Sequence, residues 1–259
     1  MTPTLVFDIE TIPDIAGLRH LYDVGMETSD QEVAEMASLL RRQQTGGSDF
    51  LAHYLQRVVT ISCVLREADR LHVFSLAEPE ADEGQIIQRF FDGIEKYTPQ
   101  LVSWNGGGFD LPVLHYRAMR HGVAAGRYWD WGDDDRDFRY NNYLNRYHTR
   151  HIDLMDVLAM YSGRANAPLD NFARLLGFPG KLGMDGGEVW GAWQRGEIDA
   201  IRDYCETDAV NTWLVYLRFQ KMRGILDDAR HDAEIALVRR SLTDLGAPHW
   251  QEFLAAWPA

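Results

Sequence analysis

Residues 4–11 read TLVFDIET, an apolar and β-branched run that ends in two acids, Asp8 and Glu10. A short apolar run of this kind predicts a buried central β-strand over residues 4–9 with carboxylates at its carboxyl end. Because Asp8 and Glu10 are two residues apart, the alternation of a strand points both carboxylates to the same face. Two such groups on one wall are the beginning of a hard-cation site, although a solvated strand end would show the same pattern.

The composition limits the class of protein. The 259 residues, 46% hydrophobic and 25% charged, suit one α/β domain with a small appendage and leave no room for a second enzyme domain. No run of eighteen apolar residues and no signal-peptide pattern appears, so we expect a cytoplasmic protein that does not bind membranes. Cys63 and Cys205 have no metal-ligand spacing, and we interpret both as buried apolar fillers.

The charge balance of 26 Lys and Arg against 39 Asp and Glu gives a net charge of −13. A protein with this net negative charge repels the phosphates of nucleic acid, so we do not expect it to coat long stretches of nucleic acid. An enzyme of chain ends is less constrained, because divalent cations at its site can reverse the local sign.

Hydrophobic periodicity predicts the order of the elements. We expect strands at 58–65, 70–76 and 100–104, the first two joined as a hairpin. We expect helices at 29–44, 82–97, 110–119, 153–162, 169–176, 188–194, 198–222, about 226–240 and about 249–256. Early strands and a helical second half indicate one α/β domain over 1–259, with a core of about 4–222 and a helical C-terminal extension of about 223–259. A Rossmann fold is disfavoured, because acids follow the first strand where a glycine-rich turn should stand.

A second acid stands in SWNGGGFDLPVL, residues 103–114. The glycines allow a tight turn, Phe109 anchors it, and Asp110 stands where a helix should begin. On this segment alone, Asp110 is equally well explained as a helix cap. Asn105 and the glycines also suit close approach of a nucleotide to the backbone.

The third motif is YCETDAVNTWLVY, residues 204–216, inside a long predicted helix. Tyr204 and Asp208 are four residues apart, so they lie on one face of the helix and can look into one cavity. A tyrosine at a core edge beside an exposed aspartate would have the same spacing.

Together the three motifs resemble, in order and context, those of the tyrosine-bearing branch of the DEDD 3′→5′ exonuclease superfamily. The pattern is Asp-x-Glu on a strand, Asn-x-x-x-Phe-Asp, and Tyr-x-x-x-Asp on a helix. The chain is most similar to stand-alone bacterial proteins described as predicted 3′→5′ exonucleases related to the proofreading domain of family B DNA polymerases. The resemblance runs from about residue 5 to 219 and includes HIDLMDVL and GFPGKLGMDGG. It implies a ribonuclease H-like fold, with a mixed central sheet flanked by helices and a helical C-terminal part.

The resemblance also implies a chemistry, in which Asp8, Glu10, Asp110 and Asp208 hold two divalent cations. All the ligands are oxygens, so Mg²⁺ or Mn²⁺ is expected rather than zinc. Asp8 would bridge the cations, Glu10 and Asp208 would complete the site of the nucleophilic water, and Asp110 would support the second cation. Tyr204, with an ordinary pKa near ~10, would orient the water rather than act as a base. The products would be nucleoside 5′-monophosphates.

Four residues are expected to contact the nucleic acid: Thr11, Asn105, Phe109 and Lys181. Lys181 is a candidate contact to the scissile or adjacent phosphate, and a solvated loop lysine is equally open. The segment 127–150 interleaves aromatic residues with arginines, as binding of single strands requires. Four aspartates weaken that interpretation, and a packed insertion or a contact between protein chains stays equally open.

Other polar residues receive no site role. Asp153 and Asp156 are interpreted as helix-start acids, and His148 and His151 are not assigned as metal ligands.

The expected partner is the 3′ end of single-stranded DNA, in proofreading or DNA repair. An exoribonuclease of the same superfamily is the alternative, because the motifs carry no contact to the sugar 2′-OH. A non-catalytic nucleic-acid-binding module on this fold is disfavoured, because a pure binder has no use for clustered negative charge. An aspartyl phosphatase is less favoured still.

Overall fold

The computed structural model describes residues 2–76 and 82–258, so both ends of the expected domain, residues 1 and 259, lie outside the described residues. The strands are β1 (Thr4–Pro13), β2 (Gln56–Glu67), β3 (Arg70–Ser75), β4 (Gln100–Ser103) and β5 (His151–Asp153). The helices are α1 (Ile15–Tyr22), α2 (Asp30–Thr45), α3 (Glu83–Tyr97), α4 (Asp110–His121), α5 (Leu154–Leu158), α6 (Leu169–Leu175), α7 (Val189–Gln194), α8 (Ile198–Met222), α9 (Asp228–Leu245) and α10 (Pro248–Ala256).

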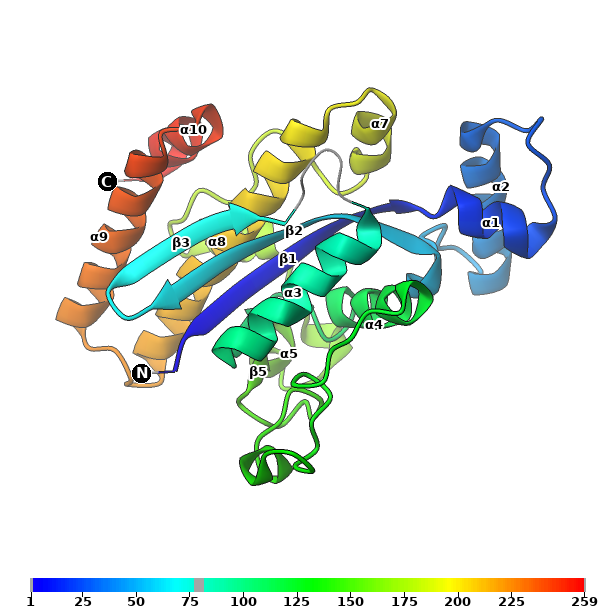
Figure 1. Ribbon diagram of the computed structural model, residues 1–259. Coiled ribbons are helices and arrows are strands. Elements are labelled where there is room, and N and C mark those ends of the chain that lie inside the picture. The colour runs from blue at the N-terminus through cyan, green and yellow to red at the C-terminus, as the bar shows by residue number, and fades with distance from the viewer. Residues whose placement is uncertain (1, 77–81, 259) are drawn as a thin grey trace.

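The five strands form one mixed sheet in the order β3-β2-β1-β4-β5. β1 lies at its centre, antiparallel to β2 and parallel to β4, while β2 and β3 form the expected hairpin and β4 runs parallel to β5. Figure 1 shows this sheet with α8 crossing one face and α3 and α4 covering the other. The order and directions are those of a ribonuclease H-like fold, which confirms the expected fold class.

The alternation of β1 divides its side chains between two cores. Val6 packs into a core with residues of α8, whereas Leu5, Phe7 and Ile9 pack into the core beneath α3 and α4. Even-numbered residues of β1 therefore face α8. The same alternation carries the acids of this strand to the α8 side.

The structure differs from the sequence-based elements at several places, and α9 ends at Leu245 rather than near residue 240. β1 continues to Pro13 through a register shift between Glu10 and Thr11, and α1 follows where no helix was predicted. β5 was missed because three residues are too few to show a period. The helix predicted at 153–162 ends at Leu158, because Met160 and Tyr161 take left-handed φ values of 51° and 60°.

The helices α1 and α2 form an arm beyond one end of the sheet (Figure 1). The arm has its own small core, which includes Leu18, Val33 and Leu51. Its base is held by Arg117 of α4, which is 2% exposed, pairs with Asp14 at 2.6 Å and also pairs with Glu83. This buried ion pair ties the start of α1 to α3 and α4.

The C-terminal helices α9 and α10 pack against α8 rather than standing apart from it. Val238, Leu242, Trp250 and Phe253 are buried in the same core as the face of α8 that covers the sheet. Among the helices of the described residues, none combines the length and the apolar character that a bilayer crossing requires.

The segment 127–150 consists of turns and one short 3₁₀ helix, as the lack of a period predicted. Tyr128, Phe138 and Tyr143 are buried in the core under α3 and α4. The Arg150 guanidinium lies 4.1 Å from the centroid of the Phe138 ring. These aromatic residues therefore serve packing, whereas Trp131, Tyr140 and Tyr147 are exposed.

Candidate active site

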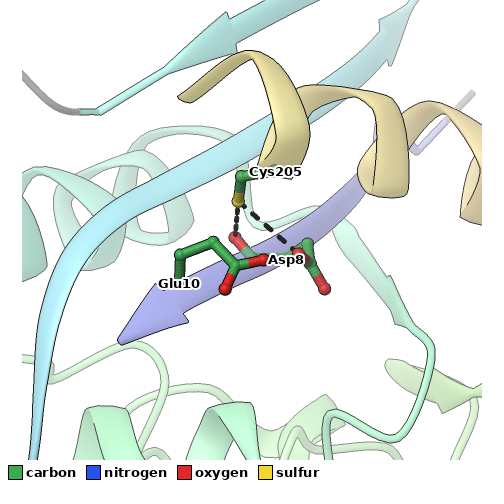
Figure 2. Close-up of side chains that lie close together, drawn as sticks. All are labelled: Asp8, Glu10 and Cys205. Carbon is green, nitrogen blue, oxygen red and sulfur yellow. Dashed lines mark hydrogen bonds between the residues drawn. The ribbon is translucent and has the colours of Figure 1, made fainter. Parts of the chain in front are cut away.

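Asp8 and Glu10 project from β1 toward the overlying turn of α8 (Figure 2). Glu10 is buried and Asp8 half-buried. A carboxylate oxygen of each and the Sγ of Cys205 all lie within 4.8 Å of one another. The strand alternation expected from the sequence is thus present, and it directs both acids into the interface with α8 rather than into solvent.

Asp110 reaches the same region through the glycine turn after β4. The turn begins at Asn105, whose φ of 66° is one that asparagine tolerates better than most residues. A Cβ at Gly106 would lie 2.3 Å from Ser103 Oγ, so glycine is required there for packing within the chain. The backbone of this turn is held by Asp153, whose carboxylate accepts hydrogen bonds from Asn105 N and Gly107 N, each at 2.9 Å.

Asp110 occupies the first position of α4, and the cap residue is Phe109, whose side chain makes no cap hydrogen bond. Asp110 is 4% exposed, and its carboxylate lies close enough to the backbone of Ile9 in β1 for that backbone to lower its pKa. A helix-capping role therefore does not explain Asp110, because its side chain faces the strand that carries the other acids.

Tyr204 and Asp208 are both buried on the face of α8 that meets β1. The Tyr204 hydroxyl lies close enough to Asp208 to lower the pKa of that carboxyl, against the rise that burial causes. Lys181 completes this group, because its ammonium lies 3.0 Å from Asp208 Oδ2 and donates to the Tyr204 hydroxyl. The turn that carries Lys181 is fixed to α8 by Asn211, whose amide donates to Gly180 O at 2.8 Å.

The electrostatics show that the four acids converge. Burial raises the pKa of Asp8 well above its ordinary value, and repulsion from Asp110, Asp208 and Glu10 raises it further. Burial likewise raises the pKa of Glu10, with repulsion from Asp208 and Asp110 adding to the rise. Burial also raises the pKa of Asp110 to about 7. Acids from β1, α4 and α8 therefore lie near enough to one another to concentrate negative charge between these elements.

Lys181 offsets part of this charge. Burial opposes its protonation, yet attraction to Asp208, Asp8 and Glu10 outweighs burial and raises the pKa of Lys181. The same attraction limits the rise that burial causes in the pKa of Asp208. Burial and the neighbouring carboxylates raise the pKa of Tyr204, so its hydroxyl stays protonated and acts as a donor.

The donor atoms fit hard divalent cations. Asp8 and Glu10 place their carboxylates together, and within the part of the chain that the structure describes the buried Oδ1 of the nearby Asp208 has no hydrogen-bond partner. A buried carboxylate oxygen without a donor is costly unless a cation takes that place. Burial raises the pKa of Cys205 well above its usual range, so the neighbouring sulfur is a neutral thiol. The set therefore favours oxygen-seeking cations over thiophilic ones.

A cavity of about 660 Å³ opens beside Glu10. Thr11, Phe50, Phe109 and Trp190 are among the residues that line it, between the helical arm and α7. The rings of Phe50 and Phe109 are tilted with centroids 5.5 Å apart. A volume in the range of ligand pockets, with aromatic walls at the acid site, can hold an unpaired nucleotide.

The predicted substrate contacts do not all meet in this cavity. Thr11 and Phe109 line it, whereas Asn105 lines a second cavity of about 460 Å³ on the other side of the glycine turn. Thr11 Oγ1 donates to Gln56 Oε1 at 3.1 Å. Lys181 lies at Tyr204 and Asp208 rather than in solvent.

Two residues have larger roles than their sequence context indicated. Cys205 is buried, as predicted, but it is not only an apolar filler, because its Sγ lies 3.4 Å from Asp8 O. Asp153 caps α5 and also holds the glycine turn, and only its place at the end of a strand signalled this. His151 Nε2 is 2.8 Å from Ser103 Oγ, and His148 Nδ1 accepts a hydrogen bond from Asn142 N.

The ribonuclease H-like sheet and the acidic pocket beside Tyr204 define a class of protein, the tyrosine-bearing DEDD exonucleases. Comparison of the sequence with known protein families agrees with this class and identifies one family within it. The family described as "Predicted 3'-5' exonuclease related to the exonuclease domain of PolB" matches residues 48–257, and the chain belongs to this family. The match includes Asp110, Tyr204 and Asp208, while Asp8 and Glu10 precede it. The chain is therefore an enzyme of the exonuclease kind.

Two curated proteins are similar to this chain over part of it. A DNA polymerase of Archaeoglobus fulgidus is 29% identical over 137 residues, which cover 52% of this chain and 17% of the polymerase. The catalytic polypeptide of DNA polymerase epsilon from Dictyostelium discoideum is 34% identical over 61 residues, which cover 23% of this chain and 3% of that polypeptide. The matched regions are thus small parts of much longer relatives.

Proposed function

We propose that this chain hydrolyses single-stranded DNA from its 3′ end, one nucleotide at a time, by a two-cation mechanism that releases nucleoside 5′-monophosphates. The observation that supports the proposal is the mutual repulsion of Asp8, Glu10, Asp110 and Asp208, which raises the pKa of Asp8 in a buried region that also holds Tyr204. Bound cations would balance this negative charge and would also give the buried Oδ1 of Asp208 a partner.

The proposed division of roles follows from position. Asp8 would bridge two cations, Mg²⁺ or Mn²⁺, because repulsion from each of the other three acids reaches its carboxylate. Glu10 and Asp208 would complete one cation site, and Asp110 would support the other from the start of α4. Bound there, the cations would acidify a water and neutralise charge that develops on the phosphate.

The side chains around the acids would position the reacting groups. The Tyr204 hydroxyl is kept protonated by its surroundings, so it would orient the attacking water as a hydrogen-bond donor or acceptor without removing a proton. The Lys181 ammonium, held at Tyr204 and Asp208, would move onto a phosphate oxygen when substrate enters. Both groups are then used in the reaction and not only in the fold.

The cavity beside Glu10 supports an unpaired 3′ end as the substrate. A terminal base can stack on Phe50 or Phe109, and a base that is free of its complement can enter the cavity that these rings line. DNA is preferred to RNA in this proposal because both similar proteins are named as DNA polymerases. A cytoplasmic location and a role in proofreading or repair stay predictions.

The test is digestion of one oligonucleotide labelled at either its 3′ or its 5′ end, with Mg²⁺, Mn²⁺ or EDTA. We expect a 5′ label to give a ladder that shortens stepwise, a 3′ label to appear first as mononucleotide, and EDTA to stop both. Matched DNA and RNA oligonucleotides then decide the sugar, because an exoribonuclease would digest the RNA preferentially.

Two variants on one helix make the test specific. Asp208→Asn removes an acid of the pocket, whereas Asp199→Asn changes an acid of α8 whose side chain is 89% exposed. We expect loss of activity in the first and wild-type activity in the second, with Asp8→Ala inactive as well. Activity that survives EDTA, or that Asp8→Ala retains, would refute the proposal, and binding without cleavage would indicate a non-catalytic module.

A further inference from the structure

A row of polar side chains crosses the face of the sheet that α8 covers. In the strand register Asp8 of β1 lies opposite Ser62 of β2, and Ser62 lies opposite Ser75 of β3. Directly opposite residues project to the same face, so the three side chains form one line beneath α8. The hydroxyls of Ser62 and Ser75 are 2.8 Å apart, and Ser62 is fully buried.

The row continues into the helices through Glu206. Ser75 Oγ donates to Glu206 Oε1 at 2.7 Å, and the other carboxylate oxygen lies 3.1 Å from His249 Nε2 on α10. Glu206 is 9% exposed. Glu206 has no role in the proposed reaction, and a helix does not require a carboxylate at this position. Its hydrogen-bond partners, Ser75 and His249, therefore give the reason for a carboxylate here.

Cys205 closes the other end of the row. Its Sγ lies 3.4 Å from Asp8 O and 3.5 Å from Asp8 Oδ2 (Figure 2), and Ser62, which lies opposite Asp8 in the sheet, is close enough to lower the pKa of the thiol. Adjacent residues of one helical turn thus contact both ends of the row, Cys205 at Asp8 and Glu206 at Ser75. The same turn carries Tyr204 and Asp208, so the row fixes how this part of α8 sits on β1.

Asp203, Glu206 and His249 each have one possible ligand atom within 4.8 Å of the others, but the imidazole turns a different nitrogen to each carboxylate. His249 Nδ1 lies 3.2 Å from Asp203 Oδ1, whereas Glu206 approaches Nε2 on the other side of the ring. An imidazole between two carboxylates bridges them, while ligands of one ion would converge on a single point. Asp203 and Glu206 therefore share His249, but only Glu206 continues to the serines and Asp8.

We propose that Glu206 is a positioning residue for the cation-binding acid Asp8 and for the turn of α8 that presents Asp208. The inference rests on the proposed two-cation function. It adds a row of hydrogen-bonded side chains that connects α10 to the proposed cation site. Hydrogen-bonded partners behind a ligand fix its orientation, and losing them typically costs about 10–100-fold in metal affinity or activity. Glu206 acts in this way through Ser75, Ser62 and Cys205.

The test compares Glu206→Ala with Asp203→Ala in the full chain. Both variants take one carboxylate from His249, but only the first interrupts the row. We expect Glu206→Ala to weaken Mn²⁺ binding about ten-fold in titration calorimetry without nucleic acid, and to lower kcat by a similar factor with KM unchanged. Asp203→Ala should bind Mn²⁺ within about two-fold of the wild type, and Glu206→Gln, which can still accept from Ser75, should recover most of the loss.

Ser75→Ala keeps the inference testable if Glu206→Ala does not fold, because it removes one hydroxyl from the same row. Wild-type Mn²⁺ affinity in Ser75→Ala, or an equal loss in Asp203→Ala and Glu206→Ala, would overturn the positioning role. A wild-type chain that binds Mn²⁺ but cleaves nothing would instead defeat the proposed function, while the calorimetry would still decide the role of Glu206.

Discussion

Replacing Asp110 by asparagine should make the metal-free protein more stable at alkaline pH. Burial raises the pKa of Asp110 to about 7 from an ordinary 3.8, with the charge of Asp153 adding to the rise and backbone hydrogen bonds opposing it. The folded pKa lies above the unfolded one, so the folded protein binds the proton more tightly. The stability gained in this way is complete below about pH 4 and is lost as the pH rises through about 7.

The size of the effect follows from the two pKa values. At about 1.36 kcal/mol per pKa unit, ionising Asp110 in the metal-free protein at pH 8 costs on the order of 4 kcal/mol, an upper value because the neighbouring acids titrate together. Asp110→Asn removes this cost. In a chain of this size, the gain corresponds to roughly 10 °C in melting temperature.

The assay is thermal unfolding followed by circular dichroism in EDTA at pH 5 and pH 8. We expect Asp110→Asn to melt above the wild type at pH 8, and by less than half as much at pH 5, with Asp199→Asn unchanged at both. Added Mn²⁺ should stabilise the wild type far more than Asp110→Asn. Equal melting temperatures of wild type and Asp110→Asn at pH 8 in EDTA would refute the electrostatic argument.

Three further substitutions test other parts of the structure. Tyr204→Phe should lower kcat far more than it weakens Mn²⁺ binding, because the hydroxyl orients water rather than cations; comparable losses in both would contradict that role. Lys181→Ala should slow cleavage of short oligonucleotides at least ten-fold, because a phosphate contact is lost. Lys221 has a similar exposure, and Lys221→Ala should leave the rate unchanged. An unchanged rate in Lys181→Ala would exclude the phosphate contact. Arg117→Ala should lower the free energy of unfolding by about 3–5 kcal/mol, because it strands two buried carboxylates, and urea denaturation should show a much smaller loss for the half-exposed Arg120→Ala.

The sequence predicted the features that depend on local period. Strand alternation placed Asp8 and Glu10 on one face, and helical spacing paired Tyr204 with Asp208. The chain order of the three motifs then identified the fold, because each acid was already attached to a recognisable strand or helix. The acids of the pocket could be named without coordinates for this reason.

What the sequence did not show depends on contacts between distant segments. The role of Asp153 needs two backbone amides of a turn that lies 46 residues or more earlier in the chain. The position of Cys205 against Asp8 joins residues 197 apart. No period within a segment reports such contacts, and β5 was not predicted because three residues are too few to establish an alternation.

The length of α8 makes the position of Asp208 sensitive to the tilt of the whole helix. Asp208 and Gln220 are twelve residues apart on one rod, about 18 Å at 1.5 Å per residue. A tilt of only about 3° about the far end would carry the carboxylate of Asp208 about 1 Å sideways, a displacement that can slow catalysis on the order of 100-fold. A substitution beneath the C-terminal half of α8 that tilts the helix should therefore lower activity, although it changes no residue of the candidate site.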